Sequence, residues 1–245
     1  MEAALKKKKT VEDLRNMILA TEGYTPKNQE NRRIKNLGRL EKAFPFYTFP
    51  EGVIHEFISE EVEQAAAATG FIGGLIGMLM QHEGPCVWVS LGKRLFPPSL
   101  VPYRIDPSRI IFIQLEKSKE ALWALEESLK CSSLSAVVAE IKDLDLIASR
   151  RLQLAVEKSR VTCFIHRFRP KQLHSMAFTC RWRIRPEISY HQAIPGIGHP
   201  FWEVTLEKVR NGKPGCWQIG WFNGQFQYQQ ERTVGKENAL HKTGS

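Results

Sequence analysis

From Gly52 onward, short apolar runs alternate with helical stretches, and few folds accommodate this order. The runs predict strands, and the stretches between them have the length and periodicity of helices. Right-handed crossovers of this kind place helices on both faces of a mainly parallel sheet. The predicted strands are Val53–Ile58, Cys86–Leu91, Ile110–Gln114, Ala136–Ala139 and Val161–His166, and the predicted helices are Glu63–Gln81, Lys119–Lys130 and Leu144–Lys158.

The last third of the chain has a different pattern, in which apolar and β-branched residues recur without helices between them. Phe178–Pro186, Trp202–Val209 and Trp217–Trp221 predict antiparallel strands that extend the same sheet, with Asn211-Gly212 as a hairpin turn. The predicted fold is therefore a three-layer α/β core. We expect a core domain over residues 45–228, an N-terminal helix and basic linker over 1–44, and a polar tail over 229–245.

The charge is unevenly distributed. The chain carries a formal net charge of +9, with basic residues in excess at both ends and acidic residues in excess over residues 43–149. An excess of basic residues favours a polyanionic partner, either nucleic acid or an acidic protein surface.

The apolar run Thr69–Met80 is too short to span a membrane and no secretory signal is evident, so we expect a cytoplasmic protein without membrane contact.

The turn after the first predicted strand is where an α/β protein of this order would hold a phosphate group. Here it contains Ser59, Glu60, Glu61 and Glu63, without the glycines and lysine of a phosphate loop. Three carboxylates would repel a triphosphate.

The later Thr69–Gly74 segment lies inside a helix and is expected to permit close helix-to-sheet packing. No residue set has the spacing of a catalytic or metal site, and the five separated cysteines are expected to be buried free thiols. We therefore expect no enzyme activity, metal or cofactor.

Three other stretches are candidate contact surfaces. The first is an apolar loop that either caps the sheet edge or binds a partner through Phe96, Pro97, Pro98 and Leu100. The second is the arginine pair Arg150 and Arg151 on an amphipathic helix. The third is a strand in which basic and apolar residues alternate, so that three arginines lie on one face. Together with nearby cations, this face is either a candidate contact for DNA phosphates or a solvated face of the sheet. Its residues are Arg181, Arg183, Arg185, Lys208, Arg210 and Lys213.

The helix that carries the arginine pair has an apolar stripe at helical spacing. Ile147, Ala148, Leu152, Leu154 and Ala155 define this stripe, which is expected to face the core, with Arg151 inside it and Arg150 at its edge. A cation in that position must be ion-paired beneath the helix or directed at a partner. Loss of Arg151 should therefore have a larger effect than loss of Arg150.

Several blocks together resemble the ImuA family, bacterial RecA-like accessory proteins of error-prone translesion synthesis. They are Leu95–Pro98, Ile105–Arg109, Glu120–Glu127 and Ala148–Ala155, within a resemblance that covers roughly residues 52–221. The resemblance implies a RecA-like core and damage-induced work beside an ImuB-type polymerase-like protein and a DnaE-type error-prone polymerase. RecA and DNA are further candidate partners, because Lys208–Lys213 looks like a RecA strand that contacts a neighbouring subunit.

The residues that make RecA an ATPase are not matched. The phosphate loop is absent from Ser59–Ala66, Ser90–Lys93 lacks the catalytic glutamate, and Glu140 stands where a magnesium-associated aspartate is expected. The resemblance thus implies a non-catalytic adaptor. Two alternatives remain, a DNA-dependent ATPase with an unusual nucleotide site and a cell-division inhibitor of the SulA type, which shares a reduced RecA-like core.

Overall fold

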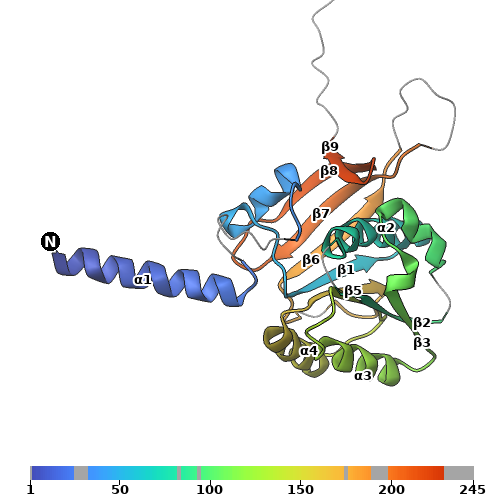
Figure 1. Cartoon of the computed structure of the whole chain (residues 1–245), viewed down its shortest axis with the longest axis horizontal. Coiled ribbons are helices and arrows are strands. Elements are labelled where there is room, and N and C mark those ends of the chain that lie inside the picture. The colour runs from blue at the N-terminus through green and yellow to red at the C-terminus, as the bar shows by residue number, and fades with distance from the viewer. Residues whose placement is uncertain are drawn as a thin grey trace, which may run out of the picture.

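Among the residues that the structure describes, nine strands form one sheet in a computed structural model (Figure 1). The described residues are 2–24, 33–81, 84–92, 95–173, 176–188 and 198–228. Across the sheet the strand order is β3-β2-β4-β5-β1-β6-β7-β8-β9. The strands are β1 (Ile54–Ser59), β2 (Cys86–Leu91), β3 (Ile110–Leu115), β4 (Ala136–Glu140), β5 (Thr162–Phe168), β6 (Cys180–Pro186), β7 (Phe201–Val209), β8 (Gly215–Phe222) and β9 (Gln225–Tyr228).

The first five strands confirm the predicted βαβ order. Every neighbouring pair among them is parallel, and the predicted bounds agree with the observed ones to within two residues. The chain passes from β1 to β2 and β3 at one edge, and then returns through β4 to β5 beside β1. This reversal places the carboxyl end of β1 at a topological switch point, where open α/β sheets leave a crevice.

The C-terminal strands extend this sheet, as predicted, but two details differ. Strand β6 pairs in parallel with β1 and antiparallel with β7, so the expectation that all three later strands are antiparallel is wrong for one side of β6. Cys180, the first residue of β6, is the register partner of His55 near the amino end of β1. Strand β9 was not predicted. It follows a second left-handed turn at Asn223-Gly224 and completes a hairpin with β8.

Helices cover both faces of the sheet, which confirms the three-layer prediction. On β4, Ala136 and Val138 face the cluster that includes α2 (Val62–Leu79), whereas Val137 and Ala139 face the cluster beneath α3 (Ser118–Leu129) and α4 (Leu146–Ser159). Figure 1 shows α3 and α4 side by side on the opposite side of the sheet from α2. This alternation explains why β4 reads as an uninterrupted apolar run.

Helix α2 is the most apolar helix of the described chain. It is long and apolar enough to cross a membrane, but most of it is buried between the sheet and the 3-10 helix η3 (Pro97–Tyr103), and this burial accounts for its composition. A Cβ at Gly74 would lie 2.6 Å from the Phe226 ring, so close packing against the sheet is confirmed there. A Cβ at Gly77 would lie 2.1 Å from the carbonyl oxygen of Tyr103, so α2 also packs closely on η3.

The N-terminal part of the chain divides into two pieces. Helix α1 (Glu2–Thr21) is present as predicted and extends away from the sheet, so that Val11, Leu14 and Ile18 are each more than half exposed (Figure 1). The following segment was expected to be a polar linker, yet Leu37 and Leu40 are buried in the core. The proposed boundary at residue 44 stays a prediction, and the tail over 229–245 lies outside the described residues.

The cysteines differ from expectation in part. All five are free thiols, but only Cys86, Cys163 and Cys180 are buried, whereas Cys131 and Cys216 are exposed. Burial raises the pKa of the Cys86 thiol to about 12, so this thiol stays protonated. Within the described ranges, no group of three or more His, Cys, Asp or Glu side chains could hold a metal ion.

Candidate functional site

The turn at the carboxyl end of β1 is very short. Strand β1 ends at Ser59 and α2 begins at Val62, so Glu60 and Glu61 alone connect them. A phosphate loop needs several residues between strand and helix, because successive backbone amides must wrap around the phosphate. The amide of Glu60 is already used, since it donates to the side-chain oxygen of Gln64 at 3.0 Å. This turn has no room for such a loop.

The charge at this turn is more balanced than the sequence predicted. The Glu60 carboxylate lies 3.1 Å from the guanidinium of Arg183, and the Glu61 carboxylate lies 3.2 Å from that of Arg169. Both arginines come from distant parts of the chain, so two of the three carboxylates that were expected to repel a triphosphate are paired with cations. The features that distinguish this turn from a phosphate loop are therefore the missing loop and lysine more than a bare negative charge.

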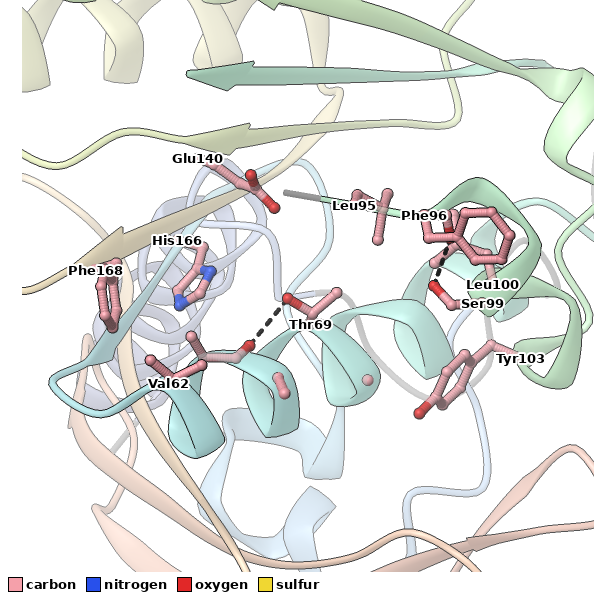
Figure 2. Close-up of a pocket in the computed structure, with 13 residues that line it drawn as sticks. Val62, Thr69, Leu95, Phe96, Ser99, Leu100, Tyr103, Glu140, His166 and Phe168 are labelled. Carbon is pink, nitrogen blue, oxygen red and sulfur yellow. Dashed lines mark hydrogen bonds between the residues drawn. The ribbon is translucent and has the colours of Figure 1, made fainter. Parts of the chain in front are cut away.

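A cavity of about 610 Å³ opens beside this turn, at the carboxyl ends of β4 and β5. Figure 2 shows its walls: the first turns of α2 on one side, η3 with Phe96 and Tyr103 on the second, and Glu140 with His166 on the third. The predicted apolar loop thus lines the cavity, with Phe96 exposed and Leu100 buried. Pro97 and Pro98 begin η3 and give it its fixed backbone.

Three polar residues lie on adjacent strands at this cavity, two of them in its wall. Ser59 ends β1, and its hydroxyl lies 2.9 Å from Nε2 of His166 on β5. On β4, Glu140 is the register partner of His166, and Figure 2 shows both side chains directed toward α2. The residue types match a nucleophilic triad, but Ser59 is completely buried and does not line the cavity. A substrate could not reach its hydroxyl, so the Ser59–His166 hydrogen bond instead joins the carboxyl ends of β1 and β5.

The arginine pair on α4 lies on the outer surface of the molecule. The buried residues of this helix are Ser149, Leu152, Gln153 and Val156, whereas Ile147 and Leu154 are 75% and 52% exposed. The predicted orientation is therefore wrong for Ile147 and Leu154, which face outward, whereas Leu152 is buried and Ala148 and Ala155 pack against the core as predicted. Ser149 can be buried because its hydroxyl donates to the carbonyl oxygen of Leu146 at 2.8 Å.

Arg151 connects the two outer helices. Its guanidinium forms an ion pair with Glu126 of α3, and its side chain remains 61% exposed. Arg150 has no hydrogen-bond or ion-pair partner among the described residues. Arg151 was expected to be either ion-paired beneath the helix or directed at a partner. In the structure it is ion-paired, but the pair joins two helices and the side chain is open to solvent.

Comparison with known proteins supplies the family. No family model matches the chain. Protein ImuA from Caulobacter vibrioides strain NA1000 / CB15N is 35% identical over 191 residues, which cover 73% of this chain and 78% of the relative. The protein of the same name from strain ATCC 19089 / CIP 103742 / CB 15 has the same identity and coverage. The chain belongs to the ImuA family. The resemblance drawn from the sequence blocks is thereby confirmed.

The predicted basic face of this ImuA-family protein is largely neutralised. The three arginines of β6 do share one face, but each contacts a carboxylate: Arg181 with Glu56 at 2.7 Å, Arg183 with Glu207 at 2.8 Å as well as with Glu60, and Arg185 with Glu203 at 3.1 Å. Lys208 and Arg210 donate to backbone carbonyls of Met176 and Ala177. Only Arg185 and Lys213 of the six are exposed.

No pattern in the sequence of this ImuA-family chain indicated that Ser59, Glu140 and His166 would lie close together. Ser59 and His166 are 107 positions apart, and no spacing rule connects them. A signal was nevertheless present, because Ser59 and Glu140 end their strands and His166 lies two residues before the end of β5. The carboxyl ends of parallel strands meet at one edge, so polar residues there are candidates for a common site.

Proposed function

We propose that this protein is a non-catalytic, RecA-like adaptor in DNA-damage-induced error-prone translesion synthesis. It docks an ImuB-type polymerase-like protein and a DnaE-type error-prone polymerase in the cytoplasm. Membership of the ImuA family supports the pathway, and the sheet with its helices on both faces supports the fold.

The observation that carries the adaptor role is the turn between β1 and α2. Two residues, both glutamates, replace the loop that would wrap a nucleotide phosphate. Hydrolysis of a triphosphate needs amides and cations around the β- and γ-phosphates. Because the turn has no loop of amides, and its two nearby cations Arg183 and Arg169 are paired with Glu60 and Glu61, binding of partner proteins accounts better for the retained fold.

The direct test compares ATP turnover with partner binding in purified full-length protein. We expect no turnover above buffer, with or without single-stranded DNA, and formation of a complex with the ImuB-type protein in size-exclusion chromatography. Hydrolysis that is abolished by changes at Glu60 and Glu61 would support the DNA-dependent ATPase instead. Filamentation of cells on overexpression, without any polymerase partner, would support the division inhibitor.

DNA and RecA remain secondary candidates for contact. Arg185 and Lys213 are the exposed members of the basic set and could approach phosphates without breaking buried ion pairs. Such contact would be insensitive to sequence, because no helix of the described chain presents base-reading side chains from this face.

A further inference from the structure

The outer surface of α3 and α4 carries a stripe that nothing in the described chain covers. Ile147, Arg151, Leu154 and Lys158 lie within one narrow arc of α4, because they are spaced by three or four residues. We name these four residues the α4 stripe. On α3, Trp123 is 65% exposed and lies one turn from Glu126, the ion-pair partner of Arg151. Single exposed apolar residues are common, but three large ones grouped around two helices are typical of a contact surface.

The charges of α4 are mainly positive, whereas α3 carries both signs. Helix α4 contains three cations, and its one carboxylate, Glu157, lies off the stripe and accepts a hydrogen bond from Gln153. Arg150 and Lys158 have no ion-pair partner among the described residues, although Arg151 is paired with Glu126. An occupant that lies along α4 must therefore be apolar at its centre and acidic where it faces Arg150 and Lys158.

The spacing of the apolar groups favours a helix. Ile147 and Leu154 are seven residues apart, which is about 10 Å along α4. This distance matches anchors at positions i and i+7 of a helix laid along α4. A β-strand would present groups on one side every two residues and would not match two turns as well.

We propose that the α4 stripe, together with Trp123, is the docking surface for an acidic amphipathic helix of a partner protein. The proposal rests on the adaptor function proposed above, since it assumes a protein partner. A second copy of this chain fits poorly, because a two-fold contact would set the same cations against each other. DNA fits poorly as well, because phosphates would leave Ile147, Leu154 and Trp123 uncovered.

The first experiment uses a designed probe and does not depend on a natural partner. Two labelled amphipathic peptides of about 18 residues share leucines at i, i+3, i+4 and i+7, and carry either glutamates or lysines on the flanks. By fluorescence anisotropy, we expect the acidic peptide to bind at least about tenfold more tightly. Equal binding of both peptides would overturn the proposal.

Variants locate the binding. I147A/L154A should weaken the acidic peptide about tenfold or more, and R150E/K158E should reverse the preference so that the basic peptide binds more tightly. The matched controls are V101A, an exposed apolar residue on η3, and K42E/K142E, two exposed cations elsewhere; both should bind as wild type. Binding that is unchanged in I147A/L154A and R150E/K158E would show that this surface is wrong.

The second experiment separates this inference from the adaptor function. If the ImuB-type protein binds wild type and both α4 variants equally, the adaptor function stands and the docking surface is wrong. If the acidic peptide binds the stripe but no polymerase partner binds the protein, the surface stands and the adaptor function fails. A dimer in sedimentation equilibrium that is lost in I147A/L154A would identify a second copy as the occupant and would overturn the proposal.

Discussion

Arg167 and Glu56 form an ion pair in which both side chains are 1% exposed, with the guanidinium nitrogen 2.7 Å from the carboxylate oxygen. The other oxygen of Glu56 accepts from Arg181 at 2.7 Å, and Arg167 donates further to the carbonyl oxygens of Lys142 and Gln172. Glu56 lies on β1, between the strands that carry the two arginines. The central strands are thus connected by charge as well as by backbone hydrogen bonds.

We expect Arg167→Met to destabilise the fold by about 3–5 kcal/mol, because removing one member of a buried pair leaves the other charge without full compensation. The measurement is the free energy of unfolding in urea. As a matched control, Glu203→Gln removes an exposed pair with Arg185 and should cost at most about 1 kcal/mol. Equal losses in the two variants would contradict this account.

His55 should make stability depend on pH. Burial lowers the pKa of this imidazole from 6.5 to about 4; its Nε2 lies 3.0 Å from the carbonyl oxygen of Pro50, and its Nδ1 accepts from Trp182. The unfolded chain therefore binds a proton below pH 6.5 while the folded chain does not. Stability should fall as the pH drops from 6.5 toward 4, by roughly 3 kcal/mol from this group.

The check on His55 compares wild type with His55→Asn in urea at several pH values. The variant should be less stable at neutral pH, because it loses the stacking of His55 on Phe49, but its stability should change less between pH 6.5 and 4. An unchanged pH dependence would assign the effect to other groups.

Gly77→Ala should destabilise the protein, although alanine is the better helix former by about 1 kcal/mol. The added methyl would lie 2.1 Å from the Tyr103 carbonyl oxygen, and backbone cannot move aside as a side chain can. We expect a net loss of about 1–3 kcal/mol in chemical denaturation. A gain in stability would show that α2 and η3 are not in close contact.

Arg151→Ala should change the melting temperature little, because the ion pair with Glu126 is largely exposed on one side and such pairs contribute about 1 kcal/mol or less. Its effect should instead be seen in partner binding, where it should exceed that of Arg150→Ala. Arg151→Lys should restore binding only in part, since lysine lacks the planar fork. Thermal melts and pull-downs with the ImuB-type protein measure the two effects.

Binding to single-stranded DNA should be weak and should fall steeply with salt. Arg185→Ala combined with Lys213→Ala should reduce the salt dependence without unfolding the protein, because both side chains are exposed. Arg181→Ala is the contrasting variant: it should lower stability through Glu56 and leave the salt dependence nearly unchanged. The reverse pattern in a salt titration would show that β6 itself contacts DNA.

The order and bounds of the core strands follow from local pattern, since burial on both faces produces apolar runs that a sequence displays directly. The orientation of α4 does not. That helix has two stripes of mixed character, and the one that includes the polar residues Ser149 and Gln153 faces the sheet. Hydrogen bonds to Leu146 and Glu157 satisfy these polar groups, and such compensation is visible only in three dimensions.

The candidate cavity was partly predictable. Phe96 and Leu100 were identified as a candidate contact surface, and the turn after the first strand was identified as the place where a phosphate site would lie. The missing information was long-range: Arg183 and Arg169 reach the first turn from positions more than 100 residues away. Strand β9 was missed although its turn, Asn223-Gly224, repeats the dipeptide that predicted the preceding hairpin.

The buried segment that contains Leu37 and Leu40 is attached to strand β9. The backbone amide of Leu40 donates to the Tyr228 hydroxyl at 2.8 Å, across 188 positions, and the Tyr24 hydroxyl donates to the carbonyl oxygen of Arg210. During synthesis on a ribosome, Tyr24 and Leu40 emerge long before their partners Arg210 and Tyr228 have been synthesised. Contacts between residues so far apart in sequence slow folding. In nascent chains, Leu37 and Leu40 are therefore expected to stay accessible to chaperones until β9 has left the ribosome.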